Sequence, residues 1–352
     1  MSPSAPPPER LARLLTGNDY FRRSPSRMGG RGAHKEWQHF LVHTEAAHLL
    51  INFSLIDDVR ATQGRQPEVA RLIVLARGEG WEGDVEHFEE AEVEVTAGRI
   101  DARFGHNTLR FIDGTYRLSI ALRDQPLAAE LELVPVTLPA LSVNQPLTLD
   151  RRLSWLFVPR LLARGTLRLA GRTVQVNDAP AYHDHNWGHF LWGNDFSWEW
   201  GSVLPWDLTN PWSLVHVRMA DRGRSVARYQ GLFLWHGGEP LRVFRDEELR
   251  VLTRGSFRKA RPFSVPRVMA LLAPGAEADL PETLEIAAHG GADTLELSFH
   301  PQDSARIVTP SEEHPEQVTI IHEVLGRVTA QGRVRGHSVA MEGTGVFEFI
   351  RD

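Results

Sequence analysis

Apolar and polar residues alternate through long parts of the chain, and this alternation predicts β-strands with one buried face. Apolar side chains occupy every even position over 116–122 and every odd position over 127–133. Asp113-Gly114, directly before the first of these ranges, is typical of a hairpin turn. Short strands at close intervals favour an antiparallel sandwich or barrel, so the predicted fold class is all-β.

Strand patterns continue through both halves of the chain, whereas helical patterns are rare. Further strands are predicted at 36–40, 49–56, 68–76, 212–219, 228–235, 283–287, 294–299, 318–324, 332–339 and 346–350. Two short helices are predicted at 8–15 and 266–273, because each begins at a proline and is closed by a glycine. The apolar range 152–164 is interpreted as a linking segment packed between the halves.

The length of 352 residues exceeds one ordinary core and predicts two domains. A weak internal repeat supports this division, since Glu36-Trp37 aligns with Glu199-Trp200 at an offset of 163 residues. Tyr182-His183-Asp184 aligns with Val346-Phe347-Glu348 at an offset of 164 residues. We therefore predict a partly disordered N-terminal arm at 1–31 and two β-barrels at 32–188 and 189–352.

Composition narrows the classes of function. A formal charge of −6 provides no basic surface for nucleic acid, and the lack of cysteine excludes disulfides and thiolate chemistry. No Gly-rich nucleotide motif and no Gly-x-Ser-x-Gly elbow occurs, so no cofactor is predicted. No run reaches the roughly 18 apolar residues that span a bilayer, so a cytoplasmic protein is expected, with peripheral membrane contact left open.

The highest concentration of reactive and polar side chains is at 181–189. This range contains a phenol, a carboxylate, an amide, an indole and three imidazoles. If this range is a strand, Tyr182, Asp184 and Asn186 share one face, and His183 and His185 share the other with Trp187. Polar groups on both faces are costly unless one face lines a cavity or a site. The range is therefore the predicted centre of function.

Each face of this strand supports a different hypothesis. His183 and His185, with His189 nearby, have a spacing that binds zinc or iron in several folds, or they hydrogen-bond backbone groups. We favour the second alternative and predict no metal. Asp184 is either a protonated general acid with a raised pKa, assisted by Tyr182, or an ionised carboxylate paired with an arginine.

Tryptophan is concentrated directly after this range, with six of the ten tryptophans between 187 and 212. Trp198 and Trp200 share a strand face with Phe196. Aromatic faces attract cations, although filling a core is the more frequent reason for such a cluster.

Two motifs resemble the carotenoid 1,2-hydratase (hydroxyneurosporene synthase) family and its AttH-like relatives. They are Tyr182-His183-Asp184-His185-Asn186-Trp187-Gly188 and Phe196-Ser197-Trp198-Glu199-Trp200-Gly201. Glu36-Trp37 and the ending Gly-x-Gly-x-Phe-x-Glu at 343–348 agree with this resemblance, which spans 32–352. It implies two lipocalin-like (calycin) antiparallel β-barrels side by side. Some relatives hydrate a terminal isoprenoid double bond, and others are similar to cyclases and Diels–Alder-type enzymes.

The residues and the resemblance together predict an enzyme for a hydrophobic isoprenoid, terpenoid or polyene substrate. Asp184 is the predicted catalytic acid, assisted by Tyr182, and the product is a hydrated or cyclised molecule. The predicted ligand contacts are Trp37, Phe196, Trp198, Trp200, Asn186, His183 and His185. Two alternatives stay open: a carrier that binds a hydrophobic molecule without chemistry, and a Diels–Alderase-type pericyclase.

Overall fold

The computed structural model describes residues 6–23, 34–57, 69–147, 150–191, 196–258, 262–268, 280–310 and 318–351. Of these residues, 70% lie in β-strands and 6% in helices, so the predicted all-β class is confirmed. The chain divides into two compact units, Pro6–Leu191 and Trp192–Asp352, with Met1–Ala5 assigned to the latter. We call them the first and the second unit. Within the described residues, no helix combines the length and the apolar character needed to cross a membrane.

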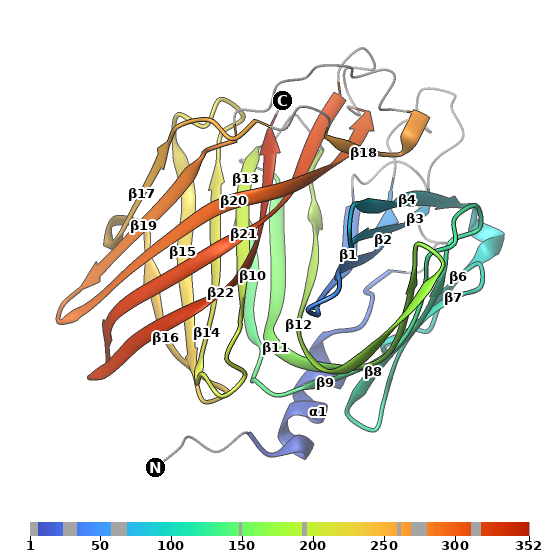
Figure 1. The fold of residues 1–352 in the computed structure, drawn as a ribbon, viewed down its shortest axis with the longest axis horizontal. Helices are drawn as coiled ribbons and strands as arrows, with labels where there is room; N and C mark the ends of the chain where they lie inside the picture. Colours follow the sequence, from blue (N-terminus) through green and yellow to red (C-terminus); the bar gives the residue numbers. More distant parts are fainter. Residues whose placement is uncertain are drawn as a thin grey trace. The chain divides into compact units, whose positions relative to one another are not determined.

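The first unit contains one large sheet and a helix, α1 (Pro8–Asn18). Its strands are β1 (His34–His43), β2 (His48–Ile56), β3 (Ala70–Arg77), β4 (Trp81–Phe88), β5 (Val93–Val95), β6 (Asp101–Phe104), β7 (Asn107–Ile112), β8 (Thr115–Ala121), β9 (Ala128–Pro135), β10 (Ala140–Pro146), β11 (Arg152–Leu169) and β12 (Arg172–His189). The strand order is β4-β3-β2-β1-β12-β11-β9-β8-β7-β6-β5, with β10 beside β11 (Figure 1). The first strand therefore pairs with the last, and the sheet curls into a nearly closed barrel.

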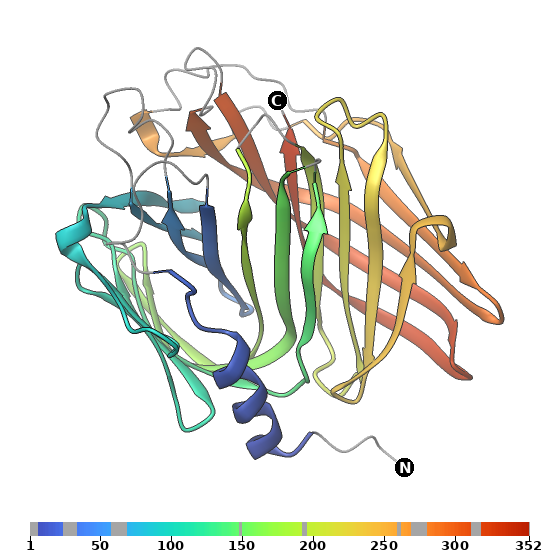
Figure 2. The same cartoon turned by 180° about the vertical axis from the view of Figure 1, so that it is seen from behind.

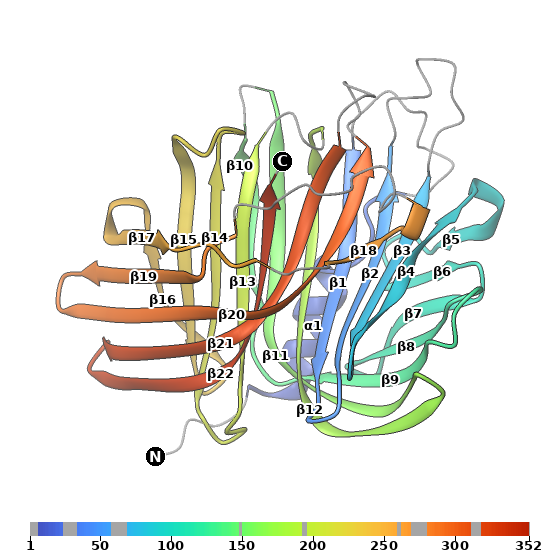
Figure 3. The same ribbon diagram turned by 45° about the horizontal axis from the view of Figure 1, so that its top comes forward.

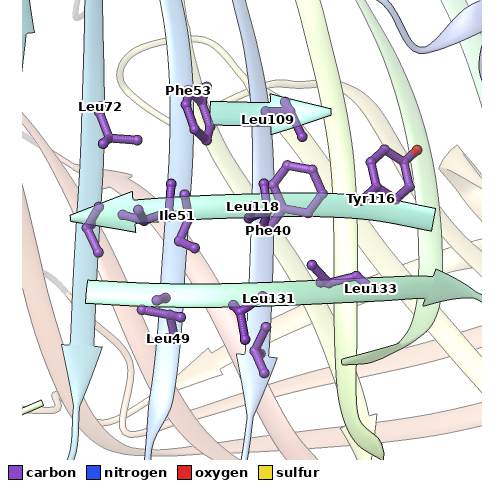
Figure 4. Packing of buried hydrophobic residues seen from close by; sticks show 14 of the residues in the cluster. Phe40, Leu49, Ile51, Phe53, Leu72, Leu109, Tyr116, Leu118, Leu131 and Leu133 are labelled. Atoms are coloured by element: carbon purple, nitrogen blue, oxygen red, sulfur yellow. The ribbon is translucent and has the colours of Figure 1, made fainter. Parts of the chain in front are cut away.

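Alternation explains the interior of this barrel. Side chains from β1 and β2, such as Phe40 and Ile51, lie across from Leu118 on β8 and Leu131 on β9 (Figure 4). All of them are at most 3% exposed. Burial of a large apolar side chain contributes about 1.5–3 kcal/mol, so this cluster is the main source of stability of the unit.

One predicted element in the first unit is wrong. The range 152–164, interpreted as a linking segment, is the first part of the long strand β11. Strand β11 bends where its register shifts between Ala163 and Gly165. A Cβ on Gly165 would lie 2.0 Å from the Glu130 carbonyl oxygen, and φ there is +135°, so only glycine fits this bend.

The N-terminal segment differs from the expected arm. Helix α1 ends at Asn18, and the chain continues from it towards β1 (Figure 2). Leu15 and Phe21 are part of the core of the first unit, and Asp19 is fully buried. The expectation rested on the Pro-, Ser- and Arg-rich composition of 1–31. Residues 24–33 lie outside the described residues.

The second unit repeats this topology. Its strands are β13 (Ser197–Pro205), β14 (Trp212–Ala220), β15 (Ala227–His236), β16 (Glu239–Arg245), β17 (Leu249–Arg254), β18 (Phe263–Val265), β19 (Thr283–Gly290), β20 (Asp293–Pro310), β21 (Val318–Val334) and β22 (His337–Arg351). They follow the order β16-β15-β14-β13-β22-β21-β20-β19-β17, and β18 pairs in parallel with β20 (Figure 3). The first strand again pairs with the last, which agrees with the repeat in the sequence.

Two predictions for the second unit need comment. The strand predicted at 332–339 is wrong, because Arg335 and Gly336 form the turn between β21 and β22, with φ of 49° and 82°. Most of the helix predicted at 266–273 lies outside the described residues.

Candidate functional site

The range 181–189 forms the end of β12, between β1 and β11. Ala181 belongs to the barrel core, so alternation directs His183 and His185 into the barrel. Asp184 and its neighbours two residues away then lie on the opposite face of the sheet. Below we call the two sides of β12 the inner face and the outer face.

A buried polar network occupies the inner face. His183 Nε2 lies 2.9 Å from Asp19 Oδ2, and His185 Nδ1 lies 3.0 Å from Asp19 Oδ1. The second nitrogen of His185, Nε2, lies 2.9 Å from Glu36 Oε1. The Tyr116 hydroxyl donates to Asp19 Oδ2 at 2.5 Å. The Asp19 side chain therefore joins the N-terminal segment to two separate strands, β8 and β12.

The hydrogen-bond pattern determines the charge of this network. The His183 ring lies between Asp19 and the backbone oxygen of His39, 2.9 Å from each. Both ring nitrogens of His185 face carboxylate oxygens, and only a doubly protonated imidazolium donates from both nitrogens. The imidazolium of His185 and the Arg22 guanidinium, 3.6 Å from Glu36 Oε1, then balance the two carboxylates of Asp19 and Glu36. Burying charges that are paired with one another costs much less free energy than burying an unpaired charge.

The pKa values agree with this assignment. Burial by itself would raise the pKa of Asp19, but His183 and His185 hold it well below its usual range. Burial likewise opposes ionisation of Glu36, yet the hydrogen bonds from His185 and His34 lower its pKa to about 2. For His185, burial favours the neutral ring, and the two carboxylates outweigh it and raise the pKa.

The polar side chains of the inner face therefore have a structural role. Arg22 adds backbone N–H bonds of 2.9 and 3.0 Å to Glu36, and its guanidinium stacks 3.5 Å from the centre of the Trp187 ring. The His183 and His185 nitrogens are engaged with oxygen acceptors. Across the parts of the chain that the structure describes, no three His, Asp or Glu side chains are grouped to hold a metal ion.

The outer face holds Asp184 in an aromatic and amide environment. Asp184 is 3% exposed, and the Asn186 amide donates a hydrogen bond to its Oδ1. Its direct cross-strand neighbours are His39 on β1 and Phe157 on β11. Cross-strand partners have Cβ atoms about 4.5–5.5 Å apart, so these two side chains flank the carboxyl group.

Large aromatic rings continue this face on both sides of Asn186. Its cross-strand neighbours are Trp37 and Trp155. The Trp155 and Phe157 rings stack with centroids 6.0 Å apart, and Trp37 meets Phe190 edge-on at 6.1 Å. These rings are buried, as is Tyr182, which pairs with Leu41 across the strands. The outer face thus combines a carboxyl, a phenol and an amide with apolar walls.

His39 is a member of this face that sequence reasoning missed. Burial, together with the nearby charge of His183, lowers the pKa of His39 to about 3, so the ring is neutral at pH 7. A signal was present in the sequence, because His39 is two residues from Trp37 on the same predicted strand. A neutral imidazole beside a carboxyl group can accept or pass on a proton.

Buried neutral histidines make the fold sensitive to acid. The pKa of His39 is about 3 and that of His216 in the second unit is about 4, in both cases mainly because of burial. The unfolded chain takes up these protons below about pH 6.5, and the folded chain does not. The contribution of these histidines to the free energy of unfolding should therefore be complete above pH 6.5 and decrease as the pH falls, by about 3 kcal/mol for each histidine at pH 4.

Urea unfolding between pH 4 and pH 7 measures this dependence. His39→Asn should flatten the curve, whereas His289→Asn, at an exposed position near the end of β19, should leave it unchanged. An equal slope in the parent and in His39→Asn would contradict the buried neutral state of His39.

The remaining predicted ligand contacts belong to the second unit. Phe196, Trp198 and Trp200 are buried there, and the first two rings are 6.1 Å apart. The Trp198 indole N–H donates to the Glu348 carboxyl, which lies directly across from Glu323. Burial raises the pKa of Glu348 to about 7, although hydrogen bonds with Glu323 and Trp198 oppose the rise. The closing strand of each unit thus carries a buried carboxyl group, at 184 and at 348.

Comparison with known proteins identifies the fold. No protein-family model matches the sequence, and a search of curated protein sequences also returned no match. The structure is similar to the AttH-like protein of Nitrosomonas europaea, with a TM-score of 0.61 and 14% identity over 90% of this chain and 92% of the other. Kievitone hydratase of Nectria haematococca matches with a TM-score of 0.57 and 12% identity, over 100% and 99%.

A third similar structure is CghA in complex with Sch210972. Its TM-score is 0.60 and its identity is 10%, over 95% of this chain and 97% of the other. At these identities the likeness is one of fold, and it extends over essentially the whole length of each protein.

Proposed function

We propose that the protein is an enzyme that adds water to a carbon–carbon double bond of a hydrophobic isoprenoid or polyene, or cyclises it, by acid catalysis. Each unit would be a lipocalin-like barrel, and the reaction would take place at the outer face of the first unit. The observation that carries the proposal is the Asp184 carboxyl, buried beside Phe157 and oriented by Asn186. The similarity to a protein named as a hydratase supports it.

The proposed reaction begins with transfer of the Asp184 proton to one carbon of the double bond. The Asn186 amide donates to Oδ1 and thereby orients the carboxyl group. The electrons of the double bond form the new C–H bond, and the other carbon becomes a cation. The π-faces of Trp37, Trp155 and Phe157 would stabilise that cation.

Capture of the cation completes the cycle. Water attacks the cation in a hydratase, and its surplus proton returns to the Asp184 carboxylate, which restores the acid. In a cyclase, an internal double bond attacks, and loss of a proton from carbon restores the acid in the same way. Neutral His39 and the Tyr182 hydroxyl are positioning groups that orient the carboxyl and the water. None of these steps requires a cofactor.

The experiment has two stages. Native mass spectrometry of the protein purified from its own host identifies the small molecule that remains bound. That compound, and its unsaturated precursors, are then incubated with the protein in D2O, and the product mass and deuterium position are determined.

Each outcome of the second stage assigns one reaction. A hydratase yields a product heavier by one water. Its deuterium is on the carbon adjacent to the one that carries the new hydroxyl group. An acid-catalysed cyclase yields an isomer with one deuterium on carbon, whereas a Diels–Alderase-type pericyclase yields an isomer without deuterium. Recovery of unchanged compound would contradict catalysis and indicate a carrier.

A further inference from the structure

Two buried carboxyl groups, those of Glu323 and Glu348, lie next to each other in the sheet of the second unit. Phe347 and Phe349 belong to the core of this unit, so alternation places Glu348 on the outer side of β22. The direct cross-strand neighbours of Glu348 are Trp200 on β13 and Glu323 on β21. Glu323 and Glu348 are only 2% and 9% exposed, and neither has a role in the proposed reaction.

The contact between the two carboxyl groups requires a proton. The side chain of Glu348 forms a hydrogen bond with that of Glu323. An ionised carboxylate can only accept hydrogen bonds, so one of the two groups must be protonated in order to donate. The Trp198 indole N–H donates to Glu348 Oε1, and an indole has no acceptor for this proton. The pair therefore carries one proton and one negative charge.

The neighbours of the pair on this face provide no positive charge. The side chains two residues away along β21 and β22 are aliphatic and buried. They are Ile321, Leu325, Val346 and Ile350. On β20, Ala305 lies across from Glu323, and Asp303, two residues earlier, carries a further carboxyl group. The basic groups of Arg306 and His322 alternate with Ala305 and Glu323 and therefore lie on the opposite face.

Titration of the pair falls near neutral pH. Burial raises the pKa of Glu348 to about 7, against the hydrogen bonds with Glu323 and Trp198. Direct cross-strand neighbours have Cβ atoms about 4.5–5.5 Å apart, so a second ionisation would place two negative charges side by side in a buried position. Both burial and a like charge oppose that ionisation. A rise in pH through neutrality nevertheless removes the shared proton.

We propose that Glu323 and Glu348 form a pH switch in the closing strand of the second unit. In the protonated state, a side-chain hydrogen bond joins β21 to β22. Loss of the proton replaces this bond by repulsion between two buried carboxylates, and the pairing of β22 with its neighbours becomes looser. The switch is independent of the proposed function, since it uses no residue of the first unit.

Two spectroscopic measurements on the full chain detect the shared proton. The infrared C=O band of a protonated carboxyl group should decrease between pH 6 and pH 9, and the part that titrates should be absent in Glu348→Gln and in Glu323→Gln. The NMR signal of the Trp198 indole N–H, assigned with Trp198→Phe, should shift with the same midpoint, because this group donates to Glu348. Asp184→Asn should leave both titrations unchanged, which separates the switch from the proposed function.

Urea unfolding measures the effect of the switch on the second unit. The pKa of Glu348 is about 7 in the folded chain and 4.5 without the fold, so its stabilising contribution is complete below pH 4.5 and is lost as the pH rises to about 7. The urea midpoint of Glu348→Gln should therefore rise relative to that of the parent by about 1 M between pH 5 and pH 8. Glu323→Gln should show the same trend.

Hydrogen exchange locates the loosening, and a third variant is the control. After correction for the intrinsic effect of pH, the β22 amides of the parent should exchange faster above pH 7 than below it, and those of Glu348→Gln should not. Glu342→Gln is the matched control on β22, since the Glu342 side chain is 54% exposed and pairs with Arg327. Its urea midpoint should stay at a constant difference from that of the parent.

Several results would overturn the inference. These are a Trp198 signal that does not titrate between pH 6 and pH 9, a titrating carboxyl band that persists in a folded Glu348→Gln protein, and a urea midpoint difference that does not change with pH. If neither glutamine variant folds, the Trp198 signal of the parent decides alone, and the absence of its titration overturns the switch.

Discussion

Replacing Asp19 by Asn is expected to lower the free energy of unfolding by about 3–5 kcal/mol, the usual cost of removing one partner from a buried ion pair. The Asp19 carboxylate accepts hydrogen bonds from Tyr116 and from the rings of His183 and His185, and all four groups are inside the first unit. The amide removes the negative charge and leaves the buried rings of His183 and His185 without the carboxylate that both contact. Glu36 contacts only the second of them, His185.

Urea unfolding at pH 7 measures the effect. Asp178→Asn is the matched control, because Asp178 is half exposed and its pairing with Arg164 should be worth no more than about 1 kcal/mol. Its φ of 48° is also one that asparagine adopts readily. Equal losses in the two variants would contradict the view that Asp19 fastens the N-terminal segment into the barrel.

The importance of Asp19 shows where sequence reasoning reaches its limit. Alternation was sufficient to predict the all-β class and the separation of Asp184 from His183 on β12. It could not reveal that the partner of His183 stands 164 residues earlier in a segment that its composition makes look loose. Periodicity reports which face a side chain occupies, and not which distant group meets it there.

The mistaken linking segment has a similar cause. Both faces of the first half of β11 are buried, so its apolar residues form a cluster without alternation. Pro159 lies within the register shift between Val158 and Leu161, a position where proline is compatible with a strand. A compact apolar run with a proline is not distinguishable from a packed loop until its pairing with β12 is known.

The candidate site could be predicted in part. The sequence indicated Asp184, Tyr182, Asn186 and Trp37, which the structure places on the outer face of the first unit. It did not indicate Trp155 or Phe157 as neighbours of this face, because they lie on β11, the strand that was not predicted. His183 and His185 were included as ligand contacts, and the structure assigns them to the inner network instead.

Asp184→Asn is expected to lower turnover by about 10²–10⁴-fold, the usual contribution of a general acid, while substrate affinity changes little. The variant keeps the shape of the side chain and an oxygen that accepts the Asn186 hydrogen bond. It loses the proton that the proposed mechanism transfers to the double bond. Tyr182→Phe should have a smaller effect, because water can replace part of the positioning by a hydroxyl group.

Glu348→Gln is the matched comparison. Glu348 is also a buried carboxyl group on a closing strand, and its raised pKa allows it to carry a proton near pH 7. If Asp184 is the acid, Glu348→Gln should retain turnover within a few-fold of the parent. A large loss in Glu348→Gln with a parent-like Asp184→Asn would transfer the acid role to the second unit.

The central claim is that Asp184 supplies the proton, and the single-turnover rate of Asp184→Asn on the compound identified from the host tests it most directly. The rate and the affinity should be measured on the same folded samples, together with those of the parent and of Glu348→Gln. We predict binding within a few-fold of the parent and a rate that is about 10²–10⁴-fold lower. A rate equal to that of the parent would show that Asp184 does not supply the proton.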